Sequence, residues 1–146
     1  PDGAVDEVIF WLADEGRMGR KAAAGFYDYD EARQRTPSDE VKQIIADFAE
    51  KEGNEQRDIS KDEIRERLLY PMVNEGAKIL EEGMAQRASD IDVVWINGYG
   101  WPLYTGGPMF WAKTIGFDTV VEGLDRHGLP VSEHLRKTAA DGGSLD

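Results

Sequence analysis

The sequence predicts an all-α protein with one short extended segment. Apolar residues recur at helical spacing through most of the chain, first in residues 4–15. The clearest helix-start signal is the capping box Ser60–Glu63, in which a serine hydroxyl and a glutamate three residues later can satisfy each other's backbone amides. No alternating run is long enough for a convincing strand, although the residues around Phe26 and Tyr27 fit a short extended segment. Helices packed on helices are therefore expected.

The first third of the chain contains two expected helices with a glycine-rich connection. The first covers residues 4–15, and glycines punctuate residues 16–29. Thr36-Pro37 has the form of an N-cap followed by a first helical residue, and Gly53 ends the pattern that follows. The apolar face of this second helix is formed by Val41, Ile44, Ile45, Phe48 and Ala49.

A long helix is expected after Ser60. Its apolar stripe should face the core and consists of Ile64, Leu68, Met72, Ile79 and Leu80. Pro71 lacks an N–H and its ring clashes with the carbonyl four residues earlier, which predicts a kink or a break. Gly83 is the expected stop.

Four shorter helices are expected in the last third of the chain. Their signals are glycines, prolines and short polar caps. The first of them is capped by Ser89 and ends at Gly98, and the second begins at Gly106-Gly107-Pro108. The third covers residues 119–127, with Asp118 as its cap and Gly128 as its end. The last covers residues 130–140, and Asp141–Asp146 is expected to be a frayed tail.

Composition excludes several classes of function. The 146 residues include 17 basic and 29 acidic ones, and the net charge of −12 disfavours nucleic acids and anionic membranes. The absence of cysteine excludes disulfides, thiolate nucleophiles and the usual zinc sites. No apolar run approaches the roughly 20 residues of a membrane span, and no signal peptide is recognisable. The chain begins at Pro1 rather than at Met, as expected of a processed or excised chain.

Two pairs of polar residues in the second half are candidate chemical groups. His127 and His134 are the only histidines, and a catalytic or metal-binding pair is one interpretation. Two ordinary surface residues are the favoured one. Asp90 and Asp92 could form a carboxylate pair, but capping and dipole complementarity at the start of their own helix are favoured.

The first third of the chain offers two further candidates. Asp28 and Asp30 could begin a site for a hard cation, although no further ligands follow at regular spacing. Gly16–Gly19 suggests a phosphate loop, but no strand precedes it and no Gly-Lys-Ser/Thr follows. Two roles are open for the cations Arg17, Arg20 and Lys21. They could contact an anion such as a CoA phosphate, or they could complement the C-terminus of a helix.

The segment Tyr99–Pro108 is rich in glycine, proline and large rings. Residues 93–117 around it carry a single charge, on Lys113. A tight interhelical turn that fills a core is the favoured interpretation, and a groove for an acyl chain or a partner is the alternative. No Ser/His/Asp arrangement with a plausible order is present.

Three segments stand out together: Gly19-Arg20-Lys21 with Gly25–Tyr29; Glu66–Glu75; and Tyr99–Pro108 with Gly116-Phe117-Asp118. They resemble, in that order, the end, the first helix, and the glycine and proline signature of the C-terminal helical domains of 3-hydroxyacyl-CoA dehydrogenases. The closing segment precedes the opening helix. The resemblance therefore implies the end of one repeat (residues 1–53, with a connector) followed by a second repeat (residues 54–146), as in multifunctional fatty-acid β-oxidation enzymes.

The resemblance implies that the chemistry lies elsewhere in the parent enzyme. Such enzymes oxidise 3-hydroxyacyl-CoA to 3-ketoacyl-CoA with NAD, using a His–Glu pair and dinucleotide glycines of a Rossmann-like domain that has no counterpart here. In the engaged repeat an Asn precedes the arginine that matches Arg67, whereas this chain has Glu66. We therefore expect no catalytic, cofactor-binding or metal-binding residue in this fragment, which would supply a scaffold and a pseudo-dimer interface.

Partners and location are expected from the same resemblance. The expected partners are the preceding repeat and the Rossmann domain of the parent chain, with acyl-CoA as the parent's substrate and self-association of the fragment as a possibility. The expected location is the cytoplasm, or a peroxisome or mitochondrion in a eukaryote. Two rivals remain open: an interaction module with an aromatic groove for acyl chains or a partner subunit, and a fragment of a single-activity dehydrogenase.

Overall fold

The structure is a computed structural model that describes residues 4–145, with only the backbone described for residues 4–6. The chain divides into two compact units, Pro1–Asp58 and Ile59–Asp146. Both are mainly helical, and the one sheet among the described residues has two strands of three residues each. The expected all-α class is confirmed.

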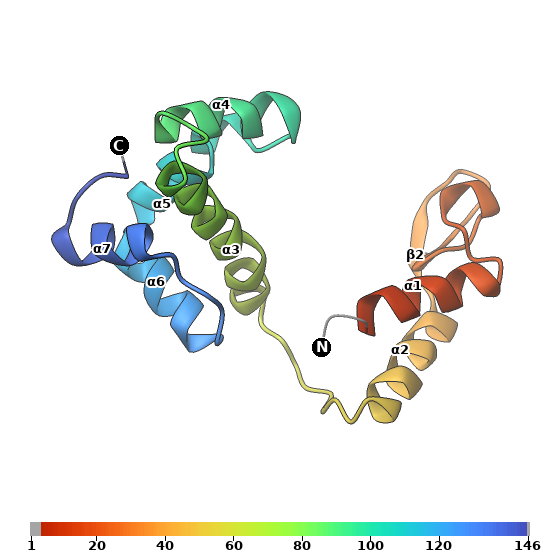
Figure 1. Ribbon diagram of the computed structural model, residues 1–146. Helices are drawn as coiled ribbons and strands as arrows, with labels where there is room; N and C mark the ends of the chain where they lie inside the picture. The colour runs from red at the N-terminus through yellow and green to blue at the C-terminus, as the bar shows by residue number, and fades with distance from the viewer. Residues whose placement is uncertain (1–3, 146) are drawn as a thin grey trace. The chain divides into compact units, whose positions relative to one another are not determined.

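The first unit consists of two helices and a small hairpin (Figure 1). Its elements are α1 (Ala4–Asp14), the 3-10 turn η1 (Arg20–Ala22), β1 (Tyr27–Tyr29), β2 (Arg35–Pro37) and α2 (Asp39–Lys51). Leu12 of α1 packs with Val41 and Ile44 of α2 in a small buried cluster. The predicted extended segment at Phe26 and Tyr27 is confirmed as β1.

The N-cap expected at Thr36-Pro37 is wrong. Both residues lie in β2, where Thr36 pairs with Asp28 and Pro37 pairs with Tyr27. A proline is tolerated in an edge strand because it needs no ladder donor there. The cross-strand pairing outweighs the local helix signal, and the helix begins only at Asp39.

The second unit is built around the long helix α3 (Lys61–Glu81), which packs on four other helices (Figure 1). The remaining elements are α4 (Ala88–Gly98), the 3-10 turn η2 (Leu103–Thr105), α5 (Pro108–Ile115), α6 (Phe117–Arg126) and α7 (Glu133–Asp141). The capping box is confirmed on its serine side: Ser60 Oγ accepts the backbone N–H of Glu63 at 3.1 Å. Pro71 lies within α3, which continues through it without a break.

Three predicted helix starts are wrong by a few residues. The cap of α4 is Arg87 rather than Ser89, and Asp118 lies in the first turn of α6, whose cap is Gly116. Carboxylates in a first turn complement the helix dipole, which explains why Asp118 resembles a cap in the sequence. The last helix begins after Ser132, whose hydroxyl accepts the N–H of Leu135, and not at residue 130.

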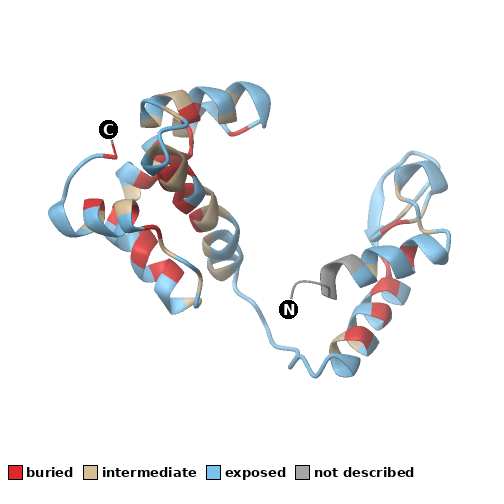
Figure 2. Cartoon of the chain, viewed as in Figure 1, coloured by how far each residue is buried: buried red, intermediate tan, exposed pale blue. Residues whose placement is uncertain are grey.

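The predicted core stripe of α3 is wrong in its first half, at Ile64 and Leu68, whereas Ile79 and Leu80 do pack against the main hydrophobic cluster. Ile64 is 46% exposed and Leu68 is 63% exposed, while Met72 and Leu80 are only partly buried. The buried residues of α3 are Tyr70, Val73, Asn74, Gly76 and Ala77. The buried residues of α3 thus lie in its middle and second half, and the exposed apolar residues Ile64 and Leu68 lie in its first half; Figure 2 shows the burial along the chain.

Glycines let the neighbouring helices approach α3 closely. A Cβ on Gly76 would lie 2.4 Å from Met109 Sδ, and a Cβ on Gly123 would lie 2.3 Å from a ring carbon of Tyr70. Both distances are far inside van der Waals contact. The core of this unit is thus fixed by backbone-to-side-chain packing of α3 with α5 and α6.

The expected frayed tail, Asp141–Asp146, is wrong for Asp141, which ends α7, and for Leu145, which is buried; Asp146 lies outside the described residues. Leu145 is 4% exposed and belongs to the main hydrophobic cluster. Its carbonyl lies 3.3 Å from His134 Nε2. The segment after α7 therefore returns to the core, where burial of the Leu145 side chain is favourable.

Among the helices described, none is both long and apolar enough to cross a membrane.

Candidate functional site

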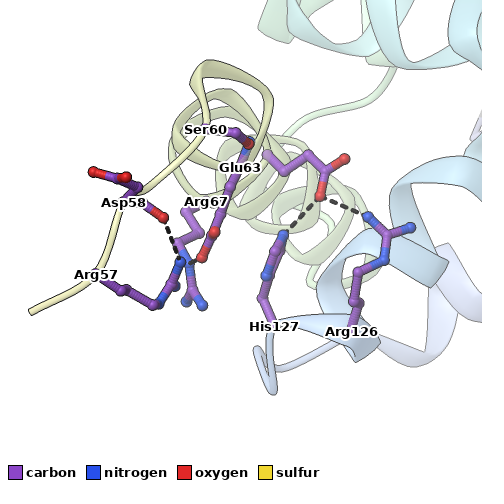
Figure 3. Close-up of polar contacts among 8 residues, drawn as sticks. Arg57, Asp58, Ser60, Glu63, Arg67, Arg126 and His127 are labelled. Atoms are coloured by element: carbon purple, nitrogen blue, oxygen red, sulfur yellow. Dashed lines mark hydrogen bonds and ion pairs between the residues drawn. The ribbon is translucent and has the colours of Figure 1, made fainter. Parts of the chain in front are cut away.

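A partly buried polar cluster joins the first half of α3 to the end of α6. Glu66 Oε2 lies 2.8 Å from Arg126 Nη1 and 2.6 Å from His127 Nε2. Figure 3 shows Arg126 and His127 directed at the same carboxylate. The side chain of His127 is 8% exposed and that of Glu66 is 21% exposed. The expectation that His127 is an ordinary surface residue is therefore wrong.

This cluster favours the ionised carboxylate. The hydrogen bond with His127 is the main cause that lowers the pKa of Glu66, and the charge of Arg126 adds to it. Burial raises the pKa of the neighbouring Tyr70. The cluster thus holds a charge in a partly buried place, which requires partners that are themselves fixed by helix packing.

The geometry suits a clamp between helices better than a catalytic dyad. The imidazole nitrogen that would act as a base is already hydrogen-bonded to Glu66, and the carboxylate is shared with Arg126. His134 instead contacts the Leu145 carbonyl, so the two histidines have different partners. Within the part of the chain that the structure describes, no group of three or more His, Asp or Glu side chains could hold a metal ion.

Asp92 acts on a different helix from its own. Its two carboxylate oxygens accept the backbone N–H groups of Met109 (2.7 Å) and Phe110 (3.1 Å) in the first turn of α5. Asp90 instead pairs with Arg87, and that hydrogen bond lowers the pKa of Asp90. The favoured role at the start of their own helix fits Asp90, which lies in the first turn of α4, but not Asp92, which serves α5 instead.

Arg17 organises the first unit. Its guanidinium donates to the Gly25 carbonyl (2.9 Å) and pairs with Asp28 (2.5 Å) and Glu40 (2.8 Å), and its side chain is 8% exposed. The Arg17 hydrogen bond is the main cause that lowers the pKa of Asp28. Asp30 accepts the backbone N–H of Gln34. The two aspartates therefore serve the hairpin rather than a common ligand, and Arg17 is occupied by protein groups.

The aromatic segment is only partly buried. Trp101 is buried, donates to Thr105 Oγ1 at 2.6 Å, and packs edge-on with Trp95 and at a tilt with Trp111. Tyr104, in contrast, is 91% exposed. Within this unit the turn therefore contributes one buried ring, Trp101, to the core, while Tyr104 stays uncovered.

A groove lies beside this turn. It has a volume of about 550 Å³ and lies between the end of α3 and α4. Its apolar wall is formed by Ile79, Met84, Ala85, Val94, Trp95 and Tyr99.

Large apolar side chains are exposed on several elements of the second unit. They occupy α3, α4, η2 and α5: Ile64, Leu68, Val93, Val94, Tyr99, Leu103, Tyr104 and Phe110. We call these eight residues the apolar surface. Exposed apolar side chains that are covered in an assembly mark interfaces, so these residues are candidates for contact with a partner.

The helices, the glycine contacts and the placement of the polar groups define a class: an all-α domain whose polar side chains hold helices together. The sequence profile of the 3-hydroxyacyl-CoA dehydrogenase, C-terminal domain, matches residues 64–142. The chain belongs to this family.

The curated relatives are much longer proteins. A peroxisomal bifunctional enzyme of Homo sapiens is 40% identical over 141 residues, which are 90% of this chain and 20% of that protein. A glyoxysomal fatty acid beta-oxidation multifunctional protein of Brassica napus is 34% identical over 137 residues, 90% of this chain and 19% of that protein. The chain spans about one fifth of the length of these relatives.

A solved structure shares the fold. The dehydrogenase part of multifunctional enzyme 1 from C. elegans has a TM-score of 0.60 and 33% identity, covering 90% of this chain and 32% of that one. The sequence resemblance to multifunctional β-oxidation enzymes is confirmed.

The pairing of Glu66 with His127 was missed by sequence reasoning. The two residues lie 61 positions apart, and neither sits in a local motif that points to the other.

Proposed function

We propose that this chain is the carboxyl-terminal helical part of a multifunctional fatty-acid β-oxidation enzyme. The parent would oxidise 3-hydroxyacyl-CoA to 3-ketoacyl-CoA with NAD, and this chain would supply scaffold and interface rather than reacting groups. The family match and the names of the relatives support the reaction class. We place the parent in the cytoplasm, or in a peroxisome or mitochondrion of a eukaryote, and the names of the relatives favour a peroxisomal compartment.

NAD has no suitable place among the described residues. Dinucleotide sites use a parallel βαβ unit with a glycine-rich turn at a helix N-terminus. The described sheet is a two-stranded antiparallel hairpin, with strands of three residues. We therefore assign the NAD site to a Rossmann domain elsewhere in the parent and derive no chemical step through the cofactor.

The observation that carries the scaffold proposal is the exposed row of α3. Ile64 and Leu68 are 46% and 63% exposed in the first half of α3, so this part of the helix has uncovered apolar side chains. Burial of such side chains stabilises an interface by about 25 cal/mol per Å². We propose that the preceding repeat of the parent chain covers these side chains. Residues 1–53 would be the last part of that repeat, and residues 54–146 would pack against it as the second half of an internal pseudo-dimer.

A complementation experiment tests this proposal. The remainder of the parent enzyme is expressed without these 146 residues, and the separate chain is added while association and NADH formation from 3-hydroxybutyryl-CoA are measured. The chain alone should be inactive, and adding it should restore a stable complex. Leu68→Glu should abolish association, whereas Arg65→Glu, an exposed control on the same helix, should leave it intact. Turnover by the chain alone, or association indifferent to Leu68→Glu, would contradict the proposal.

The groove beside α4 favours a second candidate function, an acyl-chain or partner-binding module. Its volume of about 550 Å³ and its apolar lining suit a short hydrocarbon chain. Decanoyl-CoA titrated into the chain would quench Trp95 if it enters, and Val94→Asp should abolish the change. Saturable binding lost in that variant would favour this candidate. The third reading, a fragment of a single-activity dehydrogenase, is distinguished by whether an enoyl-CoA hydratase domain is encoded upstream.

A further inference from the structure

Three arginines of the first unit line one shallow pocket. Arg20 comes from η1, and Arg33 and Arg35 come from the turn and strand that follow β1. Tyr29 and Gln34 complete the wall, and the pocket has a volume of about 370 Å³. Residues from three separate segments therefore bring three permanent positive charges to one place, in a chain with a net charge of −12.

These arginines differ from most of the others in the chain by their partners. Six arginines pair with carboxylates: Arg17, Arg65, Arg67, Arg87, Arg126 and Arg136. Across residues 4–145, no such ion pair involves Arg20, Arg33 or Arg35. The nearest acids along the chain are engaged otherwise: Asp28 pairs with Arg17, and Asp30 accepts the backbone N–H of Gln34.

Aromatic rings and backbone hydrogen bonds hold the arginines in position. The Arg20 guanidinium carbon lies 5.9 Å from the centre of the Tyr29 ring, and that of Arg35 lies 5.2 Å from the centre of the Tyr27 ring. Tyr29 is also paired with Arg35 across the two strands. Stacking of this kind fixes a guanidinium while leaving its N–H donors available.

Arg33 occupies a backbone conformation that arginine rarely adopts. Its φ is +60°, and its N–H donates to the Asp30 carbonyl at 2.9 Å. Glycine, asparagine or aspartate take this conformation more readily. An arginine at such a position, beside two more unpaired arginines, suggests that its charge has a function.

We propose that Arg20, Arg33 and Arg35 bind the phosphates of a small-molecule diphosphate, such as a nucleoside diphosphate. Guanidinium groups recognise phosphate oxygens through two parallel N–H···O bonds, and three of them match the charge of a diphosphate. A nucleic-acid strand fits less well because the acidic remainder of the chain repels an extended phosphate backbone. This inference does not depend on the proposed β-oxidation function.

Titration of the 146-residue chain tests the site directly. The side-chain Nε–Hε signals of the arginines are followed by ¹⁵N NMR at constant ionic strength, with pyrophosphate, ADP and adenosine as probes. Pyrophosphate and ADP should produce saturable shifts at Arg20, Arg33 and Arg35 with a Kd of about 1 mM, while adenosine produces none. No saturable shift with pyrophosphate, or equal shifts with adenosine, would overturn the proposal.

Variants separate a built site from general attraction. Arg20→Ala and Arg35→Ala should each weaken pyrophosphate binding about threefold to tenfold. Arg33→Gly should weaken pyrophosphate binding by a similar factor. Because glycine readily adopts the positive φ of this position, weaker binding of this variant is not explained by a folding defect. Lys51→Ala, at the far end of α2 in the same unit, removes one charge and should leave the affinity unchanged. An equal loss in Lys51→Ala, or tighter binding of a single-stranded oligonucleotide than of ADP, would refute the assignment.

Discussion

Replacing Asp92 by alanine should destabilise the second unit by about 2–4 kcal/mol. The carboxylate accepts the N–H groups of Met109 at 2.7 Å and Phe110 at 3.1 Å. Met109 is buried, so its N–H would lose its acceptor away from water, at a cost of about 1–3 kcal/mol. The N–H of Phe110 can find water and costs about 0.5 kcal/mol. The lost interaction between the carboxylate and the dipole of α5 adds about 0.3–1 kcal/mol.

The matched variants are Asp92→Asn and Asp90→Ala. The asparagine amide keeps one acceptor oxygen but loses the charge, and its NH₂ group points at the second backbone N–H. The loss of unfolding free energy in Asp92→Asn should therefore be smaller than in Asp92→Ala, about 1–2 kcal/mol. Asp90 is two residues away on the same helix and is part of an exposed pair with Arg87. Its replacement should change stability by less than about 0.5 kcal/mol.

Urea unfolding followed by tryptophan fluorescence measures these differences. Three of the four tryptophans (Trp95, Trp101 and Trp111) belong to the second unit, so the fluorescence transition reports mainly that unit. The midpoint should shift while the slope stays constant, because the exposed area on unfolding is similar. A midpoint for Asp92→Ala equal to that of the wild type, or a loss of the same size in Asp90→Ala, would show that the carboxylate does not anchor α5.

Four other outcomes are expected. Trp101→Ala should cost about 3–5 kcal/mol in the same urea assay, because a buried ring is removed and its packing on Trp95 and Trp111 is lost; a neutral variant would mean that the ring is solvent-facing in solution. Because the pKa of Glu66 is lowered on folding, its charge stabilises the folded state above the unfolded pKa of about 4.3, and this stabilisation is lost as the pH falls through the folded pKa. The stability of Glu66→Gln should therefore decrease less than that of the wild type below about pH 5. Parallel pH profiles of the two proteins would count against the clamp. The chain should self-associate through the apolar surface, and Leu68→Glu should reduce its concentration-dependent sedimentation; a wild-type monomer at high concentration would contradict this. Hydrogen exchange should show protection on both sides of Pro71, with faster exchange confined to the turn that lacks its N–H donor; an unprotected stretch around it would contradict a continuous α3.

Helix positions were predictable because their signals are local. The capping box at Ser60, the proline that opens α5 and the glycines that follow helix ends each act within a few residues. Errors appeared where a distant partner outweighed a local signal, as at Thr36-Pro37, which pairs with β1. Asp92 is a second example. The sequence shows an acidic residue near the start of a helix, but it does not show that the carboxylate accepts hydrogen bonds from the first turn of α5.

The orientation of α3 was not predictable from its own sequence. The rows containing Leu68 and Val73 are both apolar, and periodicity alone ranks neither above the other. The orientation of α3 depends on Gly123 and Met109, which lie far along the chain and pack against Tyr70 and Gly76 in the row of Val73. Helical periodicity supplied the fold class and the resemblance supplied the domain family, whereas the Glu66–His127 contact required the packed helices.

The burial of Leu145 has a practical meaning for where this domain ends. The family match stops at residue 142, and a truncation designed from that boundary would remove Leu145 together with its contacts to the main hydrophobic cluster. Deleting a fully packed leucine costs about 2–5 kcal/mol, a large part of the stability of a unit this size. A shortened protein of that kind would expose its core, aggregate, and give a false impression that the domain cannot fold by itself. Any preparation intended to isolate the second unit should therefore retain the residues after α7.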